Sequence, residues 1–144
     1  MASKSPLNIV EDALTAVLSA NTSLSAYTVF KGCDAGKLTL PSIIVSCESA
    51  SFPPELPQGL GNYVCRVKVG VFTQVDDQTL TNHRDAVAEV VGTLDDVAQV
   101  KASFNSIGDA SCYDNTMTGL NEETAERAFM TSLTYDCLIV LPPV

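Results

Sequence analysis

The sequence predicts an α+β fold in which helices flank a mostly antiparallel sheet of about four to five strands. Apolar residues recur at helical spacing near the N-terminus and again in the second half of the chain, whereas other segments alternate apolar and polar residues as half-buried strands do. The expected order is helix, two strands, a loop, a strand, one or two helices and two strands. No linker or repeat divides residues 1–144, so we expect a single domain.

The first helix is expected within "SPLNIVEDALTAVLSAN". Ser5 is a suitable N-cap, and Pro6 suits the first helical position, where its missing N–H is not needed. Asn21 and Thr22 are expected to end the helix. One apolar stripe follows the helical spacing and predicts the buried face: Ile9, Val10, Ala13, Leu14, Val17 and Leu18.

Two strands and a loop are expected next. "AYTVFKG" predicts a short strand that Gly32 stops. "LPSIIVSCESA" predicts a strand that begins at Pro41, because the first position of a strand tolerates proline. "SFPPELPQGLGN" contains three prolines and two glycines in twelve residues, so we interpret it as a long, projecting loop.

Two longer segments show the alternation of half-buried strands. In "YVCRVKVGVFTQ", polar residues and Gly70 alternate with the residues expected to face the core, which are Tyr63, Cys65, Val67, Val69 and Val71. In "AFMTSLTYDCLIVLPP", which we expect to end at Pro142, the core-facing residues are Leu133, Tyr135, Cys137, Ile139 and Leu141.

The segments between these strands predict helices, a strand and a turn. A second helical stripe, which we expect to be interrupted near Gly92, consists of Leu80, Val87, Val90, Val91 and Leu94. "TLDDVAQVKASF" restarts the helical spacing, with Thr93 or Asp95 as its cap. "DASCYDNTM" predicts a strand, and the polar segment "TGLNEETAE" predicts a turn or loop.

The charge of the chain is unevenly distributed. The formal net charge is −9; residues 1–75 contain five acidic and five basic residues, whereas residues 76–144 contain twelve acidic and three basic ones. A surface with so few cations releases few counterions from nucleic acid, so we do not expect a nucleic-acid-binding module. No apolar run approaches the roughly 20 residues of a membrane-spanning helix, and the first residues lack the apolar core of a signal peptide. We expect a soluble protein made in the cytoplasm.

The cysteines indicate no metal site. The five thiols contain no C-x-x-C pair, and a single histidine does not complete the usual zinc arrangements. We expect small buried thiols that stay reduced. These residues are Cys33, Cys47, Cys65, Cys112 and Cys137.

The stretch "QVDDQTLTNHRDAV" concentrates the titratable residues. Asp76, Asp77, His83 and Asp85 are candidates for acid/base chemistry or for ligating a hard metal ion. We favour a structural interpretation, because acidic residues are favoured at a helix N-terminus, with Asp76, Asp77 or Thr79 as the cap. His83 is then expected on a partly solvated flank, and its replacement by alanine is expected to change stability by no more than roughly 1 kcal/mol.

No other motif indicates catalysis. The sequence has no G-x-S-x-G elbow and no phosphate-cradling glycine loop. Asp95 and Asp96 are typical of a helix start. Glu122, Glu123 and Glu126 are expected to form a solvent-facing acidic turn, with calcium binding as the alternative. We therefore expect no catalytic residues, no metal and no cofactor.

In the order of its elements the chain resembles the tail terminator (tail completion) proteins of long-tailed bacteriophages. Three segments carry the resemblance, together with the first helix. They are "LPSIIVSCESA", "YVCRVKVGVFTQVDDQTLTNHRDAVAEVVGTL" and the closing "ERAFMTSLTYDCLIVL", which look like the family's Leu-Pro strand, its strand and acidic-capped helix, and its Arg-aromatic strand. The ordered pattern covers most of the chain, although none of the segments is a sharp motif.

The resemblance implies a non-enzymatic virion protein that is assembled in the host cytoplasm. Proteins of this family form a hexameric ring on the tail tube, stop its polymerisation and present a surface to the head connector. The partners implied are further copies of the chain, the tube protein and the head-completion protein. DNA passes through the lumen without specific binding, which suits the acidic half of the chain. The candidate subunit or tube contacts are Pro53, Pro54, Pro57, Glu122, Glu123 and Glu126.

Two other function classes remain open. The first is a different neck or head-completion protein of the same kind of virion, because small α+β ring proteins differ little in sequence pattern. The second is a small ligand-binding or enzymatic α+β domain, which requires a pocket with convergent polar groups.

Overall fold

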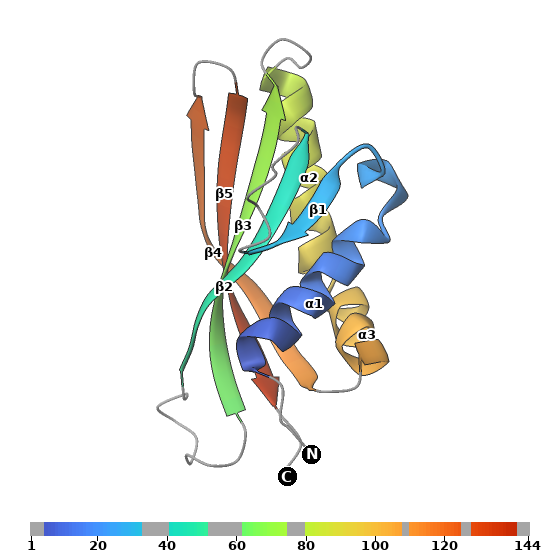
Figure 1. Ribbon diagram of the computed structural model, residues 1–144, viewed down its shortest axis with the longest axis vertical. Helices are drawn as coiled ribbons and strands as arrows, with labels where there is room; N and C mark the ends of the chain where they lie inside the picture. Colours follow the sequence, from blue (N-terminus) through green and yellow to red (C-terminus); the bar gives the residue numbers. More distant parts are fainter. Residues whose placement is uncertain are drawn as a thin grey trace.

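The computed structural model describes residues 5–32, 41–51, 62–74, 80–107, 110–124 and 128–140. These residues form one twisted sheet whose helices all lie against the same face (Figure 1). The predicted α+β class and the predicted order of elements are confirmed. None of the described helices lies on the other face of the sheet (Figure 1).

The sheet has five strands in the order β1-β2-β3-β5-β4. Only β1 and β2 are parallel, and every other neighbouring pair is antiparallel, as the sequence predicts. The strands are β1 (Thr28–Lys31), β2 (Ser42–Ser51), β3 (Asn62–Gln74), β4 (Ser111–Thr124) and β5 (Ala128–Val140). The short β1 and the long β4 are therefore its two edge strands.

The first helix, α1 (Pro6–Ser19), follows the sequence prediction closely. The Ser5 hydroxyl accepts a hydrogen bond from the Leu7 N–H at 3.2 Å, and Pro6 occupies the first turn. All six residues of the predicted stripe are buried, against β2 and the third helix. A short 3₁₀ turn, η1 (Thr22–Leu24), follows, capped by the Asn21 side chain.

The second helix, α2 (Leu80–Asp95), continues through Gly92, so the predicted interruption is wrong. A glycine is tolerated there because a single helical glycine costs only about 1 kcal/mol, and Gly92 faces open space. The third helix, α3 (Val97–Ile107), is capped by neither Thr93 nor Asp95. Asp96 separates the two helices, and its Oδ1 accepts a hydrogen bond from the Gln99 N–H at 3.3 Å. Thr93 stays helical, and its hydroxyl donates to the Glu89 carbonyl at 2.8 Å.

The core lies between the helices and one face of the sheet. Val67, Val69 and Val71 on β3 are fully buried, and so are Leu133 and Ile139 on β5. Val69 and Leu133 are paired in the β3–β5 register. The alternation in both strands thus identified the covered face correctly, and burial of each such side chain stabilises the fold by about 1.5–3 kcal/mol. Leu141 and Pro142 lie outside the described residues.

The strand β4 is longer than predicted. The segment "TGLNEETAE" is not a turn in its described part, because β4 pairs with β5 as far as Thr124. The ladder is irregular after Cys112 and again after Met117, and each bulge shifts the alternation of side chains by one residue. An edge strand with two bulges shows no single periodicity, which explains why its second half resembled a loop.

Candidate functional site

His83 is fully buried, so the expected position on a partly solvated flank is wrong. It lies in the first turn of α2, above β3 and β5. Its Nδ1 lies 2.8 Å from the Thr73 hydroxyl on β3, and its Nε2 lies 2.8 Å from the Thr131 hydroxyl on β5. The imidazole ring also packs against Phe129 at a centroid distance of 5.6 Å. The signal in the sequence was the spacing of His83, Val87, Val90 and Leu94, which places the histidine on the apolar stripe.

The surroundings of His83 favour a structural role. Burial is the largest influence on the imidazole and lowers its pKa, so the neutral ring is the stable form in the folded protein. One ring nitrogen donates a hydrogen bond and the other accepts one, and the two threonine hydroxyls satisfy both. His83 therefore fastens α2 to two strands of the sheet, and Asp85 on the same helix is exposed. Asp76 and Asp77 lie outside the described residues.

Glu122 lies on β4, where it holds the edge strand to α2. The Arg84 Nε donates to one Glu122 carboxylate oxygen at 3.0 Å, and Nη2 donates to the other at 2.8 Å. This two-point hydrogen bonding lowers the pKa of Glu122. The candidate contact Glu122 is thus already engaged within the chain. Glu123 is exposed, and its carboxylate accepts a weak hydrogen bond from Asn121 at 3.4 Å.

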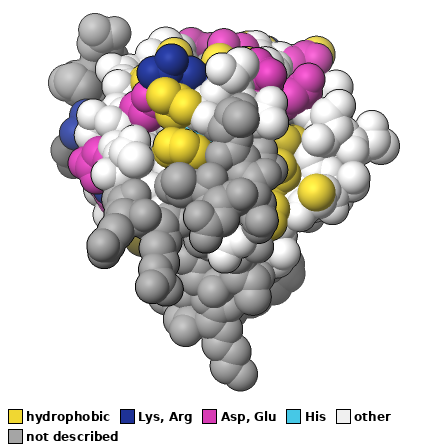
Figure 2. Space-filling model, turned by 90° about the horizontal axis from the view of Figure 1, so that it is seen from above, with side chains coloured by type: hydrophobic (Ala, Val, Ile, Leu, Met, Phe, Trp, Pro, Cys, Tyr) yellow, Lys and Arg dark blue, Asp and Glu magenta, His cyan; other side chains and the backbone are white. Residues whose placement is uncertain are grey.

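The remaining candidate contacts are Pro53, Pro54, Pro57 and Glu126, which lie outside the described residues. The described part of the chain offers other exposed groups that sequence reasoning missed. Its large exposed apolar side chains, Tyr113, Met117 and Leu120, are all on the edge strand β4. Acidic side chains gather along one margin of the face shown in Figure 2, where Lys and Arg side chains are few.

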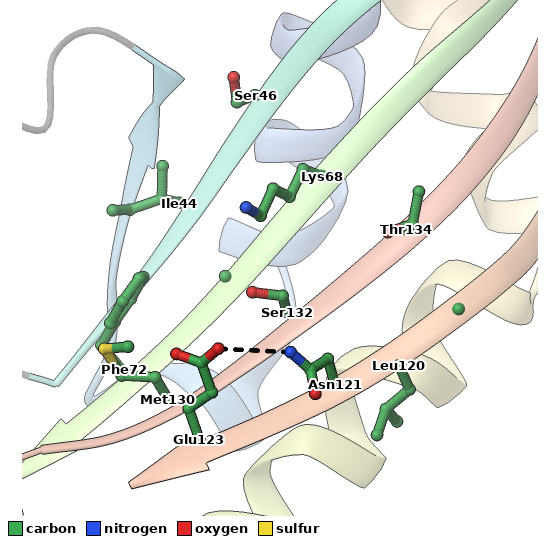
Figure 3. A pocket seen from close by; sticks show the side chains of 12 residues that line it. Ile44, Ser46, Lys68, Phe72, Leu120, Asn121, Glu123, Met130, Ser132 and Thr134 are labelled. Atoms are coloured by element: carbon green, nitrogen blue, oxygen red, sulfur yellow. Dashed lines mark hydrogen bonds between the residues drawn. The ribbon is translucent and has the colours of Figure 1, made fainter. Parts of the chain in front are cut away.

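The open face of the sheet contains a hollow of about 590 Å³. Its floor includes Gly70, and a Cβ at this position would lie 2.7 Å from the Phe72 ring. Glycine therefore lets the Phe72 ring lie against the strand and form one wall of the hollow. Figure 3 shows Lys68, Ser132 and Thr134 projecting from β3 and β5 beside it. The hollow mixes apolar and polar walls and is open to solvent.

Among the described residues, no group of three or more His, Cys, Asp or Glu side chains is arranged to hold a metal ion. None of the described helices is long and apolar enough to span a membrane.

No protein-family model matches the chain, and no curated protein matches its sequence. A virion protein shares the fold. The matching chain comes from a solved structure described as "Virion of native gene transfer agent (GTA) particle". The TM-score is 0.62 at 15% sequence identity, and the match covers 90% of this chain and 93% of that chain. At this identity the likeness shows a common fold, which extends over nearly the whole of both chains.

Proposed function

We propose that this chain is a structural protein of a phage-like virion and that it carries no catalytic activity. The observation that carries the proposal is the fold shared with a virion chain over 90% of this one. The buried histidine supports it, because both nitrogens of that ring serve to hold α2 on the sheet.

Within the virion, we propose the role of tail terminator, in which a ring of six copies ends the tail tube and receives the head connector. The sequence resemblance supports this finer assignment. A ring must close, because a head-to-tail contact that does not close grows into a filament instead of ending one. The acidic half of the chain suits a lumen through which DNA slides, since like charges do not adhere.

The contacts of the ring are proposed to involve Glu123, the neighbouring edge of β4 and the segment that contains Pro53, Pro54 and Pro57. Glu123 is exposed on a strand whose outer edge has no neighbouring strand in the described sheet. Glu126 is a further candidate on sequence grounds. Glu122 contributes indirectly, because its ion pair with Arg84 holds β4 against α2.

The test is an assembly reaction in which the protein is omitted. Tails made without it are expected to be irregularly long and to fail to join heads, and adding the purified protein back is expected to restore both length and joining. Normal lengths with failed joining would indicate a different neck protein. Tails of normal length that join heads unaided would refute both virion roles.

A further inference from the structure

Four cysteines form a row across the helix-covered face of the sheet. They lie on four neighbouring strands, in the order Cys47 on β2, Cys65 on β3, Cys137 on β5 and Cys112 on β4. All four are buried, as the sequence predicts, and none is in a disulfide bond; Cys33 lies outside the described residues. The row consists of two interacting pairs. The sulfurs of Cys112 and Cys137 are 3.8 Å apart, and the interaction between Cys47 and Cys65 lowers the pKa of Cys47 and raises the pKa of Cys65.

The two outer thiols share one local geometry. The β2–β3 register shifts after Cys47, and the β4–β5 register shifts after Cys112. In each case the thiol also donates to the carbonyl oxygen two residues later, at 3.7 Å for Cys47 and 3.4 Å for Cys112. A bulge turns a side chain away from its regular position on the strand. In both places the bulge lies next to an outer thiol, and that thiol contacts a thiol on the adjacent strand.

The two pairs differ in how firmly their strands are held. β2 pairs with β1 over Ser42–Val45, so Cys47 lies beyond that ladder, and its N–H instead donates to the Glu11 carboxylate of α1 at 2.8 Å. Among the described strands, β4 pairs with β5 alone. A strand segment that is held on one side opens locally more readily than one that is held on both sides. Cys112 is therefore the more accessible of the two outer thiols when the sheet fluctuates.

The electrostatic surroundings favour the outer thiol of each pair. The interaction with Cys137 lowers the pKa of Cys112, against burial and the Asp114 carboxylate, and the Lys101 cation acts in the same direction. The interaction with Cys65 likewise lowers the pKa of Cys47, against burial and the carboxylates of Glu11 and Glu48. The thiolate is the nucleophile in thiol–disulfide exchange. Of the two outer thiols, Cys112 is on the strand that opens more readily, so Cys112 is the attacking sulfur of the row.

We propose that Cys112 and Cys137 are a redox-responsive pair that closes to a cross-strand disulfide when the folded protein meets a disulfide oxidant such as glutathione disulfide. The Cys112 thiolate attacks one sulfur of the oxidant, forms a mixed disulfide and releases one glutathione thiolate. Cys137 then loses its proton and attacks the Cys112 sulfur, and the second glutathione leaves as a thiolate. The protein thiols lose two electrons and two protons, and the oxidant is reduced to two glutathione thiols.

The closed pair would join the edge strand to the interior of the sheet. The sulfurs must approach from 3.8 Å to about 2.05 Å, and side-chain rotation with a small shift of the bulged strand supplies this movement. The two cysteines are 25 residues apart in sequence. Linking them restricts the unfolded chain, so we expect the midpoint of thermal unfolding to rise by about 5 °C or more.

The experiment uses the full chain with Cys33 replaced by serine. The remaining thiols are then the four of the row. The reduced protein is incubated with glutathione disulfide, quenched with acid, alkylated and digested with trypsin. Cleavage after Lys101 and Arg127 places Cys112 and Cys137 in different peptides, whereas Cys47 and Cys65 share one. We expect one linked species that joins the peptides of Cys112 and Cys137, formed at least tenfold faster than any other disulfide.

Two variants complete the design. Cys112→Ser is expected to abolish the linked peptides and the rise in melting midpoint while keeping the circular dichroism spectrum. Cys47→Ser is the matched control from the other pair. It is expected to leave both the linked peptides and the rise in melting midpoint unchanged. A folded parent protein that forms no link, only a mixed disulfide with glutathione, or a Cys65–Cys137 link would overturn the proposal. If Cys112→Ser fails to fold, the linked peptides of the parent protein still show whether Cys112 and Cys137 form the disulfide.

Discussion

The Arg84 guanidinium and the Glu122 carboxylate form a two-point ion pair, with N–O distances of 3.0 and 2.8 Å, that joins the first turn of α2 to the edge strand β4. The two residues are 38 positions apart in sequence. The ion pair lies beside the buried His83, so one turn of α2 is attached to the sheet by an exposed charged contact and a buried neutral one.

We predict that Glu122→Gln lowers the melting midpoint slightly at neutral pH and that added salt removes the difference, because exposed ion pairs are screened. The folded pKa of Glu122 is lowered by Arg84. The Glu122 carboxylate therefore stabilises the folded protein at a pH above the ordinary glutamate pKa. This stabilisation is lost as the pH falls through the lower pKa that Glu122 has in the folded protein. Melting midpoints of both proteins between neutral and acidic pH should converge at the acidic end. A difference that persists in acid would contradict the ion-pair explanation.

His83→Ala is predicted to destabilise the fold by about 2–4 kcal/mol, because it leaves a cavity and two buried hydroxyls without a partner. This prediction replaces the small effect expected from the sequence. Urea unfolding measures the change, and Asp85→Ala, on the same helix but exposed, is the control with an expected effect within about 0.5 kcal/mol. Equal effects of the two changes would show that the buried hydrogen bonds contribute little.

The buried histidine also predicts a pH dependence. Its folded pKa is lowered from the ordinary value of 6.5, so the unfolded chain binds the proton more readily. The stability that results is complete above the unfolded pKa and is lost as the pH falls from that value towards the folded pKa. Urea titrations across this range should show the loss in the parent protein and a smaller one in His83→Gln. Identical curves for the two would contradict the role of His83.

Val69→Asp and Ile139→Asp are each predicted to prevent folding, because an unpaired carboxylate in the core costs several kcal/mol. Lys68→Asp is the matched control, since Lys68 is adjacent in sequence but exposed on the open face. Circular dichroism and cooperative thermal melting distinguish the outcomes. A soluble, cooperatively melting Val69→Asp protein would place the register of β3 one residue away from the one described.

Glu123→Lys is predicted to impair tail completion while leaving the fold unchanged. Glu123 is exposed on β4, and among the described residues its side chain has a weak contact with Asn121, so a reversed charge there is expected to act on a neighbouring molecule. The measurement is the fraction of tails of normal length joined to heads when the variant replaces the parent protein. Asp85→Lys, an equal charge change on α2, is the control. Full activity of Glu123→Lys would remove this residue from the proposed ring contact.

Local sequence rules correctly predicted the helices and strands whose apolar residues all lie on one face. The capped start of α1 and the faces of β3 and β5 follow from a capping serine and from uninterrupted periodicity, which each segment carries within itself. The same rules failed for β4, because two bulges and an exposed edge remove any single period. They also misplaced His83, because its polarity was given more weight than its position on the apolar stripe of α2.

The sequence by itself determined the α+β class, the order of the elements and the core-facing residues of α1, β3 and β5, because these depend on periodicity and on turn and capping chemistry. Tertiary structure alone decided which distant residues meet. Thr73 and Thr131 approach His83 from two strands, Glu122 reaches Arg84 from the edge, and four cysteines scattered along the chain form one row. The physical reason is that strand order and register, which no segment encodes alone, bring these side chains together.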